Sequence, residues 1–168
     1  MMNKAVLLLG GNMGNRFHNL ETACKMLQSE AGSIVKASSF VESEPWGFDD
    51  SRYFLNQVVV LETRFSPEDL LLKLHEIENE LGRKRTGKQY SSRTMDIDIL
   101  YFNTDVVDSE ALTIPHKHLH NRLFTMLPLA EIEPDYVHPV FGKTNRELLA
   151  ACEDKSKVKL LNGERVTL

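Results

Sequence analysis

A strongly basic stretch runs directly into an apolar strand that carries two acids, and this feature constrains the chain most. Residues 83–93 read RKRTGKQYSSR and hold five cations. In the next segment, Met95 to Phe102, alternation places Asp96 and Asp98 on one strand face, roughly 7 Å apart. Carboxylates this close repel unless a cation lies between them, and oxygen ligands suit Mg²⁺. The arginines suit phosphate oxygens. The pattern therefore favours Mg²⁺-dependent chemistry on a phosphate.

The plainer explanation is that a solvated basic loop precedes a strand with one solvated face. Either feature alone is more often of that kind. However, the basic loop and the acidic strand are adjacent in sequence and carry opposite charges, and Gly87 lies between the cations of the loop. This combination favours the functional interpretation.

Composition narrows the class of protein. The chain has 168 residues, 42% apolar and 26% charged, so we expect one globular domain over residues 1–168. Its net charge is −4, which favours one local anionic ligand over a nucleic acid. The first apolar run, Ala5 to Leu9, is too short to span a membrane. Cys24 and Cys152 have no metal or redox spacing, which fits a reducing cytoplasm. We therefore expect a cytoplasmic protein. We also expect a monomer with no nucleic-acid or membrane partner.

The order of predicted elements indicates an α+β fold. Apolar spacing and punctuation by Gly and Pro predict strands over 5–9, 34–42, 54–63 and 95–102, and helices over 16–31 and 66–81. The order strand, helix, strand, strand, helix, strand is typical of the ferredoxin-like split β-α-β arrangement, an antiparallel sheet with helices packed on one face. A short strand over 105–108, helices over 122–132 and 144–152, and a hairpin around Asn162-Gly163 are predicted to follow.

Several short motifs occur together in one order and spacing. They are LGGNMGN at 9–15, EPWG at 44–47, FLN at 54–56, Glu78 followed by GRKR at 82–85, RTMDIDIL at 93–100, and Pro115-His116 followed by NRLF at 121–124. Over residues 4 to 150 the chain resembles the 6-hydroxymethyl-7,8-dihydropterin pyrophosphokinases, which transfer diphosphate from ATP to a pterin alcohol in folate biosynthesis. The Arg-x-x-Asp-x-Asp motif at 93–98 and the Pro-His…Asn-Arg-x-Phe motif at 115–124 are specific to this family when they occur together.

The resemblance implies roles for individual residues. Asp96 and Asp98 match carboxylates that bind two Mg²⁺ ions, and Arg83 and Arg93 match catalytic cations nearest the transferring group. The residues implied in ATP binding are His75, Glu78, Arg85, Lys88, Tyr90, Arg93, Thr113, His116 and Arg122. The residues implied in pterin binding are Ser43, Trp46, Phe54, Asn56 and Phe124, with Phe54 and Phe124 stacking on the ring and Asn56 binding its edge.

Some positions depart from the family pattern, and two other functions remain open. Gln89, Tyr90 and Ser91 stand where the family commonly has a basic residue, Trp, and Gly or Ala, and Glu44 replaces a frequent Pro. These departures affect ATP binding and loop closure first. A ferredoxin-like sheet with aromatics and a basic loop can also bind single-stranded RNA. A different Mg²⁺-dependent phosphoryl or nucleotidyl transferase is the other alternative.

Overall fold

The structure is a computed structural model that describes residues 1–44, 53–82 and 94–161. Within them lie eight strands, four α-helices and one 3₁₀ helix. The strands are β1 (Asn3–Gly11), β2 (Ser33–Ala37), β3 (Phe40–Ser43), β4 (Phe54–Thr63), β5 (Asp96–Phe102), β6 (Val107–Asp108), β7 (Thr113–Ile114) and β8 (Val158–Leu161). The helices are α1 (Arg16–Glu30), α2 (Pro67–Glu80), η1 (Leu119–Asn121), α3 (Leu123–Ile132) and α4 (Asn145–Ala150).

One antiparallel sheet organises the chain. Its strand order is β5-β1-β4-β3-β8, with β2 also paired to β4, and β6 and β7 form a separate two-stranded sheet. Because α1 links β1 to β2 and α2 links β4 to β5, the predicted α+β, ferredoxin-like arrangement is confirmed.

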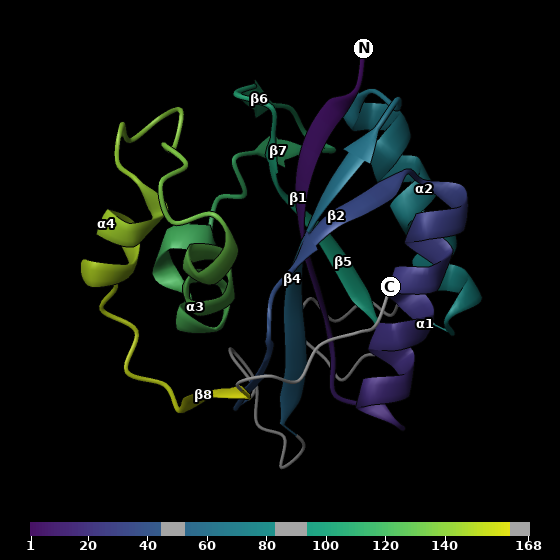
Figure 1. Cartoon of the computed structure of the whole chain (residues 1–168), viewed down its shortest axis with the longest axis horizontal. Helices are drawn as coiled ribbons and strands as arrows, with labels where there is room; N and C mark the ends of the chain where they lie inside the picture. The colour runs from purple at the N-terminus through teal and green to yellow at the C-terminus, as the bar shows by residue number, and fades with distance from the viewer. Residues whose placement is uncertain (45–52, 83–93, 162–168) are drawn as a thin grey trace.

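Helices cover both faces of the sheet (Figure 1). On one face α1 and α2 pack against β1 and β5, through Leu27 and Ile77 among others. On the other face α3 and α4 pack through Met126, Leu129 and Leu148. Successive strand residues point to opposite faces, so the buried strands contribute side chains to both cores. The prediction of helices on one face therefore holds for α1 and α2 only.

The helix ends follow from local sequence. Asn15 Oδ1 accepts the His18 backbone N–H at 3.1 Å, and Ser66 Oγ accepts that of Asp69 at 3.2 Å, so each side chain satisfies an otherwise unpaired donor. Gly82 follows α2 with φ 89°, a conformation that residues with a Cβ avoid. These are the start and stop positions expected from the sequence.

The strand predicted over 34–42 is instead two strands. Ala37 pairs with Val59, and Val41 pairs with Asn56. An advance of four residues from Ala37 to Val41 is therefore matched by only three residues on β4. The extra residue lies at Ser38-Ser39, where Ser38 Oγ accepts the Val58 N–H at 2.9 Å in place of a backbone carbonyl. A buried serine hydroxyl thus shifts the register.

The last described segment of the chain adds a strand to the sheet. Strand β8 pairs with β3, with Ser43 opposite Val158. The predicted turn at Asn162-Gly163 lies outside the described residues. No helix in the described ranges is both long and apolar enough to cross a membrane.

Candidate active site

One row of residues runs across the sheet and brings predicted site residues together. Gly10 of β1 lies opposite Asp96 of β5 on one side and opposite Asn56 of β4 on the other. Residues directly opposite in antiparallel strands share a face. A Cβ on Gly10 would lie only 1.9 Å from Asn56 Oδ1. The glycine therefore leaves room for the Asn56 side chain beside the aspartate.

Both aspartates lie on β5, at one edge of the described sheet. Asp96 and Asp98 are partly buried, whereas Ile97 between them points into the core beneath α1 and α2. The Ile97 N–H donates to Glu78 Oε2 at 2.7 Å, and the Glu78 side chain is only 2% exposed. A buried carboxylate from α2 therefore fixes the strand between the two acids.

Beside the aspartates, the end of β3 and the start of β4 form one side of the candidate site. Asn56 is 4% exposed and Ser43 is 1% exposed, and Asn56 Nδ2 donates to Ser43 Oγ at 3.3 Å. Phe54 lies opposite Ser43 in the register and two residues before Asn56, on the same face. The buried amide is thereby held in one orientation next to an aromatic ring.

The start of α3 adds two side chains, Arg122 and Phe124, on the same face of the sheet. The guanidinium carbon of Arg122 lies 5.6 Å from the centroid of the Phe124 ring. Phe124 also packs against the core cluster formed by α3, α4 and the sheet. A cation and an aromatic ring thus stand together at the beginning of this helix.

His116 lies beside β5 and is neutral at pH 7. Its backbone N–H donates to the Leu100 carbonyl at 3.0 Å, and its ring Nδ1 accepts the His118 backbone N–H at 3.2 Å. Burial, aided by the positive charge of Arg122 and opposed by Asp96, lowers the pKa of His116 to about 4. Because Nδ1 accepts, Nε2 carries the proton and can donate it to an anion.

The other predicted residues are placed differently. His75 lies on α2 one turn before Glu78, on the helical layer behind the sheet, and the contact seen for Glu78 is with the β5 backbone. Thr113 is exposed on β7. Six further residues with predicted roles lie outside the described residues, namely Trp46, Arg83, Arg85, Lys88, Tyr90 and Arg93.

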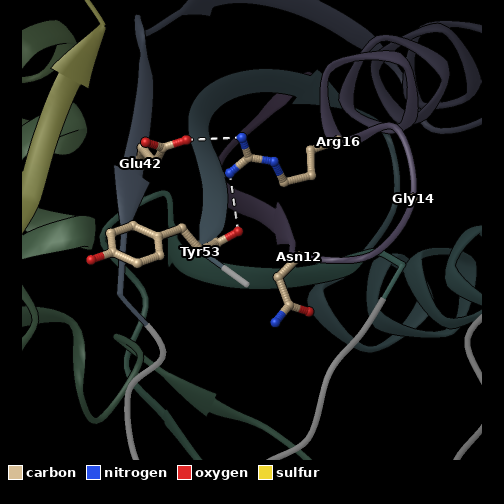
Figure 2. Close-up of a pocket in the computed structure, with 5 residues that line it drawn as sticks. All are labelled: Asn12, Gly14, Arg16, Glu42 and Tyr53. Carbon is tan, nitrogen blue, oxygen red and sulfur yellow. Dashed lines mark hydrogen bonds and ion pairs between the residues drawn. The ribbon is translucent and has the colours of Figure 1, made fainter. Parts of the chain in front are cut away.

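A pocket of about 480 Å³ opens at the same end of the sheet. Figure 2 shows its lining residues, Asn12, Gly14, Arg16, Glu42 and Tyr53. Arg16 crosses it, with Nη2 2.8 Å from Glu42 Oε2 and Nη1 donating to the Tyr53 carbonyl at 3.0 Å. Glu42 alternates with Ser43, so it faces α1 rather than Asn56. Sequence reasoning missed this ion pair, since nothing local connects positions 16 and 42.

The described residues offer a partial cation site. They include no group of three or more His, Cys, Asp or Glu that could hold a metal ion. Asp96 and Asp98 nevertheless fit Mg²⁺, which is commonly bound by one or two carboxylates together with substrate phosphates. Such a site would be complete only with a phosphate-bearing substrate.

Comparisons with known proteins agree with this chemistry. The model of a family described as 7,8-dihydro-6-hydroxymethylpterin-pyrophosphokinase (HPPK) matches residues 6–134. The 2-amino-4-hydroxy-6-hydroxymethyldihydropteridine pyrophosphokinase of Aquifex aeolicus is 40% identical over 139 residues, which cover 83% of this chain and 86% of that protein. The protein of the same name from Haemophilus influenzae is 38% identical, and the match covers 93% and 97%.

Solved structures share the fold. The Plasmodium falciparum HPPK-DHPS with pteroate superposes with a TM-score of 0.76 at 19% identity, over 90% of this chain and 44% of that longer chain. At this identity the likeness concerns the fold alone. The matched family model and the relatives near 40% identity show that the chain belongs to the 7,8-dihydro-6-hydroxymethylpterin-pyrophosphokinase family.

Proposed function

We propose that this pyrophosphokinase acts at the row formed by Asp96, Gly10 and Asn56, with Mg²⁺ held by the aspartates. Its reaction moves pyrophosphate from ATP, the co-substrate, to the hydroxymethyl group of 6-hydroxymethyl-7,8-dihydropterin in folate biosynthesis. The alcohol oxygen forms a bond to the β-phosphorus, the bond between that phosphorus and the α,β-bridging oxygen breaks, and AMP leaves. The observation that carries the site is the shared face of Asp96 and Asn56.

The pterin would lie between Phe54 and Phe124, with its polar edge toward Asn56. The Asn56 amide is held by Ser43, so little orientational freedom is lost when a ring hydrogen-bonds to it. Aromatic rings on both sides suit a flat bicyclic ligand. Trp46 and the backbone near Ser43 would complete the pocket.

The two aspartates would hold two Mg²⁺ ions together with the ATP phosphates. When bound, Mg²⁺ neutralises phosphate charge and acidifies a coordinated alcohol. Glu78 supports this arrangement, because its contact with the Ile97 N–H fixes the backbone between the ligands. The carboxylates therefore need little reorganisation when the ions bind.

ATP would contact residues on three segments. Neutral His116 can donate from Nε2 to a phosphate oxygen, and Arg122 can bind phosphate through its guanidinium. We assign His75, Glu78 and Thr113 to the nucleotide end. The loop cations and tyrosine would close over the phosphates, with Arg83 and Arg93 at the transferring group; the other members are Arg85, Lys88 and Tyr90. Arginines aimed at the transferring group act mainly in the transition state.

The decisive experiment is to identify the nucleotide product when the protein meets ATP, Mg²⁺ and the reduced pterin. Pyrophosphoryl transfer gives AMP in equal amount to the pterin diphosphate. Formation of ADP would favour another phosphotransferase on this fold, and no pterin-dependent turnover would favour a binding module. Omission of Mg²⁺ tests the metal dependence in the same assay.

We also propose that residues 1–168 act as a single domain, as a monomer and in the cytoplasm, where ATP is available. The two core clusters support one domain, because they lie on opposite faces of the same sheet. Size-exclusion chromatography with light scattering tests the monomer; a dimeric mass at micromolar concentration would refute it.

A further inference from the structure

The segment from Asp154 to Leu161, here called the C-terminal strap, contacts both walls of the candidate pterin pocket. It lies beyond residues 6–134, which the family model matches. In Figure 1 the chain descends from α4 past α3 and forms β8, in yellow, beside the sheet. One end of the strap binds the start of α3, and the other pairs with β3.

At α3 the strap supplies the helix cap. Asp154 Oδ2 accepts the N–H of Leu123, the first residue of α3, at 2.9 Å, whereas the Arg122 side chain does not cap the helix in the described chain. Pro128 lies inside α3 and has no N–H to donate to the Phe124 carbonyl four residues earlier. The first N–H of α3 is therefore paired by a carboxylate 31 residues away in sequence.

The same carboxylate is fixed within the strap. Asp154 Oδ1 accepts the Ser156 N–H at 2.9 Å. Burial raises the pKa of Asp154, but the hydrogen bonds from Leu123 and Ser156 outweigh it, so the pKa lies below its usual value. The cap is therefore ionised at neutral pH and favours the positive end of the helix.

At β3 the strap is held by Glu44, which makes two contacts with Lys157. The Glu44 N–H donates to the Lys157 carbonyl at 3.3 Å, and Glu44 Oε1 accepts the Lys157 N–H at 3.0 Å. Ser43, next to Glu44, lies opposite Val158 in the ladder. A proline at position 44 could make neither contact, because it has no N–H and no carboxylate.

We propose that the C-terminal strap is a positioning element that sets the spacing of the pterin pocket by joining α3 to β3. Asp154 and Glu44 are the positioning residues. Phe124 stands on the α3 side, and Ser43, which holds Asn56, stands on the β3 side. This inference rests on the proposed pterin site, because it concerns the same pocket.

Four variants test the strap in the full-length chain. Asp154→Ala removes the cap, whereas Asp154→Asn keeps an oxygen acceptor at the same place. Glu44→Pro removes both β3 contacts, whereas Glu44→Gln keeps an acceptor. Asp135→Ala removes an acid whose side chain is 84% exposed and forms an ion pair with Arg146 at 3.2 Å, so this variant controls for the loss of one negative charge.

Loss of a helix cap predicts that Asp154→Ala raises the pterin KM about fivefold. We expect kcat at saturating substrates to stay within about twofold, because the aspartates are untouched. Asp154→Asn, Glu44→Gln and Asp135→Ala should remain close to the parent protein. Asp154→Ala and Glu44→Pro together should change the pterin KM by less than the product of the single effects, since each opens the same strap. Hydrogen exchange at the Leu123 amide should rise in Asp154→Ala.

The results separate this proposal from the function on which it rests. Absence of AMP formation by the parent protein would refute the proposed function. If the parent protein forms AMP and Asp154→Ala binds pterin like the parent, the strap is structural only and the proposal fails, whatever the change in Tm. Fully multiplicative effects of the two substitutions would also overturn it.

Discussion

Substitution of Gly10 by alanine tests whether the row across the sheet depends on a missing side chain. The added Cβ would lie 1.9 Å from Asn56 Oδ1, and ordinary contact begins at 3.4 Å, so the oxygen must retreat by 3.4 − 1.9 = 1.5 Å. Asn56 is buried and its amide is bound to Ser43, so this movement also breaks a buried hydrogen bond. Overpacking costs about 1–3 kcal/mol and the lost bond about 1 kcal/mol.

We therefore expect Gly10→Ala to lower the free energy of unfolding by about 2–4 kcal/mol. For a chain of this size that corresponds to a fall in Tm of roughly 4–16 °C. The pterin KM should rise at least about tenfold, because Asn56 no longer faces the ring edge, while the ATP KM changes little. Urea unfolding at pH 7 and initial rates with each substrate varied give the three quantities.

The companion variant Asn56→Ala shows where the strain arises. In that background the atom that clashes is gone, so Gly10→Ala should cost far less stability than in the parent, although pterin binding stays weak. The reasoning is refuted if Gly10→Ala destabilises both backgrounds equally, since the clash would then not involve Asn56. It is also refuted if Gly10→Ala leaves Tm and pterin KM unchanged.

Three further perturbations test the proposed metal site, the contact of Glu78 with the β5 backbone, and the buried His138. Asp96→Asn or Asp98→Asn should abolish turnover at any Mg²⁺ concentration with Tm retained, because the amide keeps the size and loses the charge; turnover near the parent rate would remove the assignment. Glu78→Leu should lower the free energy of unfolding by about 1–3 kcal/mol in urea by leaving the Ile97 N–H unpaired, whereas Glu78→Gln keeps an acceptor; equal stability of all three proteins would contradict this. His138 is 3% exposed, accepts two backbone N–H groups at Nδ1, and has its pKa lowered to about 4, first by burial. Its folded pKa lies below the unfolded value, so the free energy of unfolding should fall as pH drops from about 6.5 toward 4, and an NMR titration showing this ring protonated at pH 6 would refute it.

Sequence alone predicted what local chemistry determines. The alternation at Asp96 and Asp98, the caps at Asn15 and Ser66, and the stop at Gly82 each depend on neighbours within a few residues. The family motifs added the roles that we propose for the site residues. The fold class followed from the order of these elements, since few topologies suit two helices on one antiparallel sheet.

The remaining features depend on contacts between distant segments. The break at Ser38 arises because its hydroxyl meets the Val58 N–H on another strand, which no local pattern reveals. The pairing of β8 with β3, and the cap that Asp154 gives to α3, join positions far apart in the sequence. An isolated Asp-x-Ser in a polar tail is compatible with many roles. Glu44 similarly looked like a simple departure from the family pattern until its contacts with Lys157 were known.

The candidate site is a continuation of the core face of the same three strands. Side chains two residues apart on a strand lie on the same face. Along this face, β5 leads from Leu100 to the two aspartates, β1 from Leu8 to Gly10, and β4 from Val58 to Asn56. The apolar members are buried with the residues of α3 and α4, and the polar members come just beyond them. The strands that orient the two aspartates and the amide are thus fixed by the adjoining packed core. The rigidity that a pre-organised site requires is supplied by ordinary hydrophobic burial.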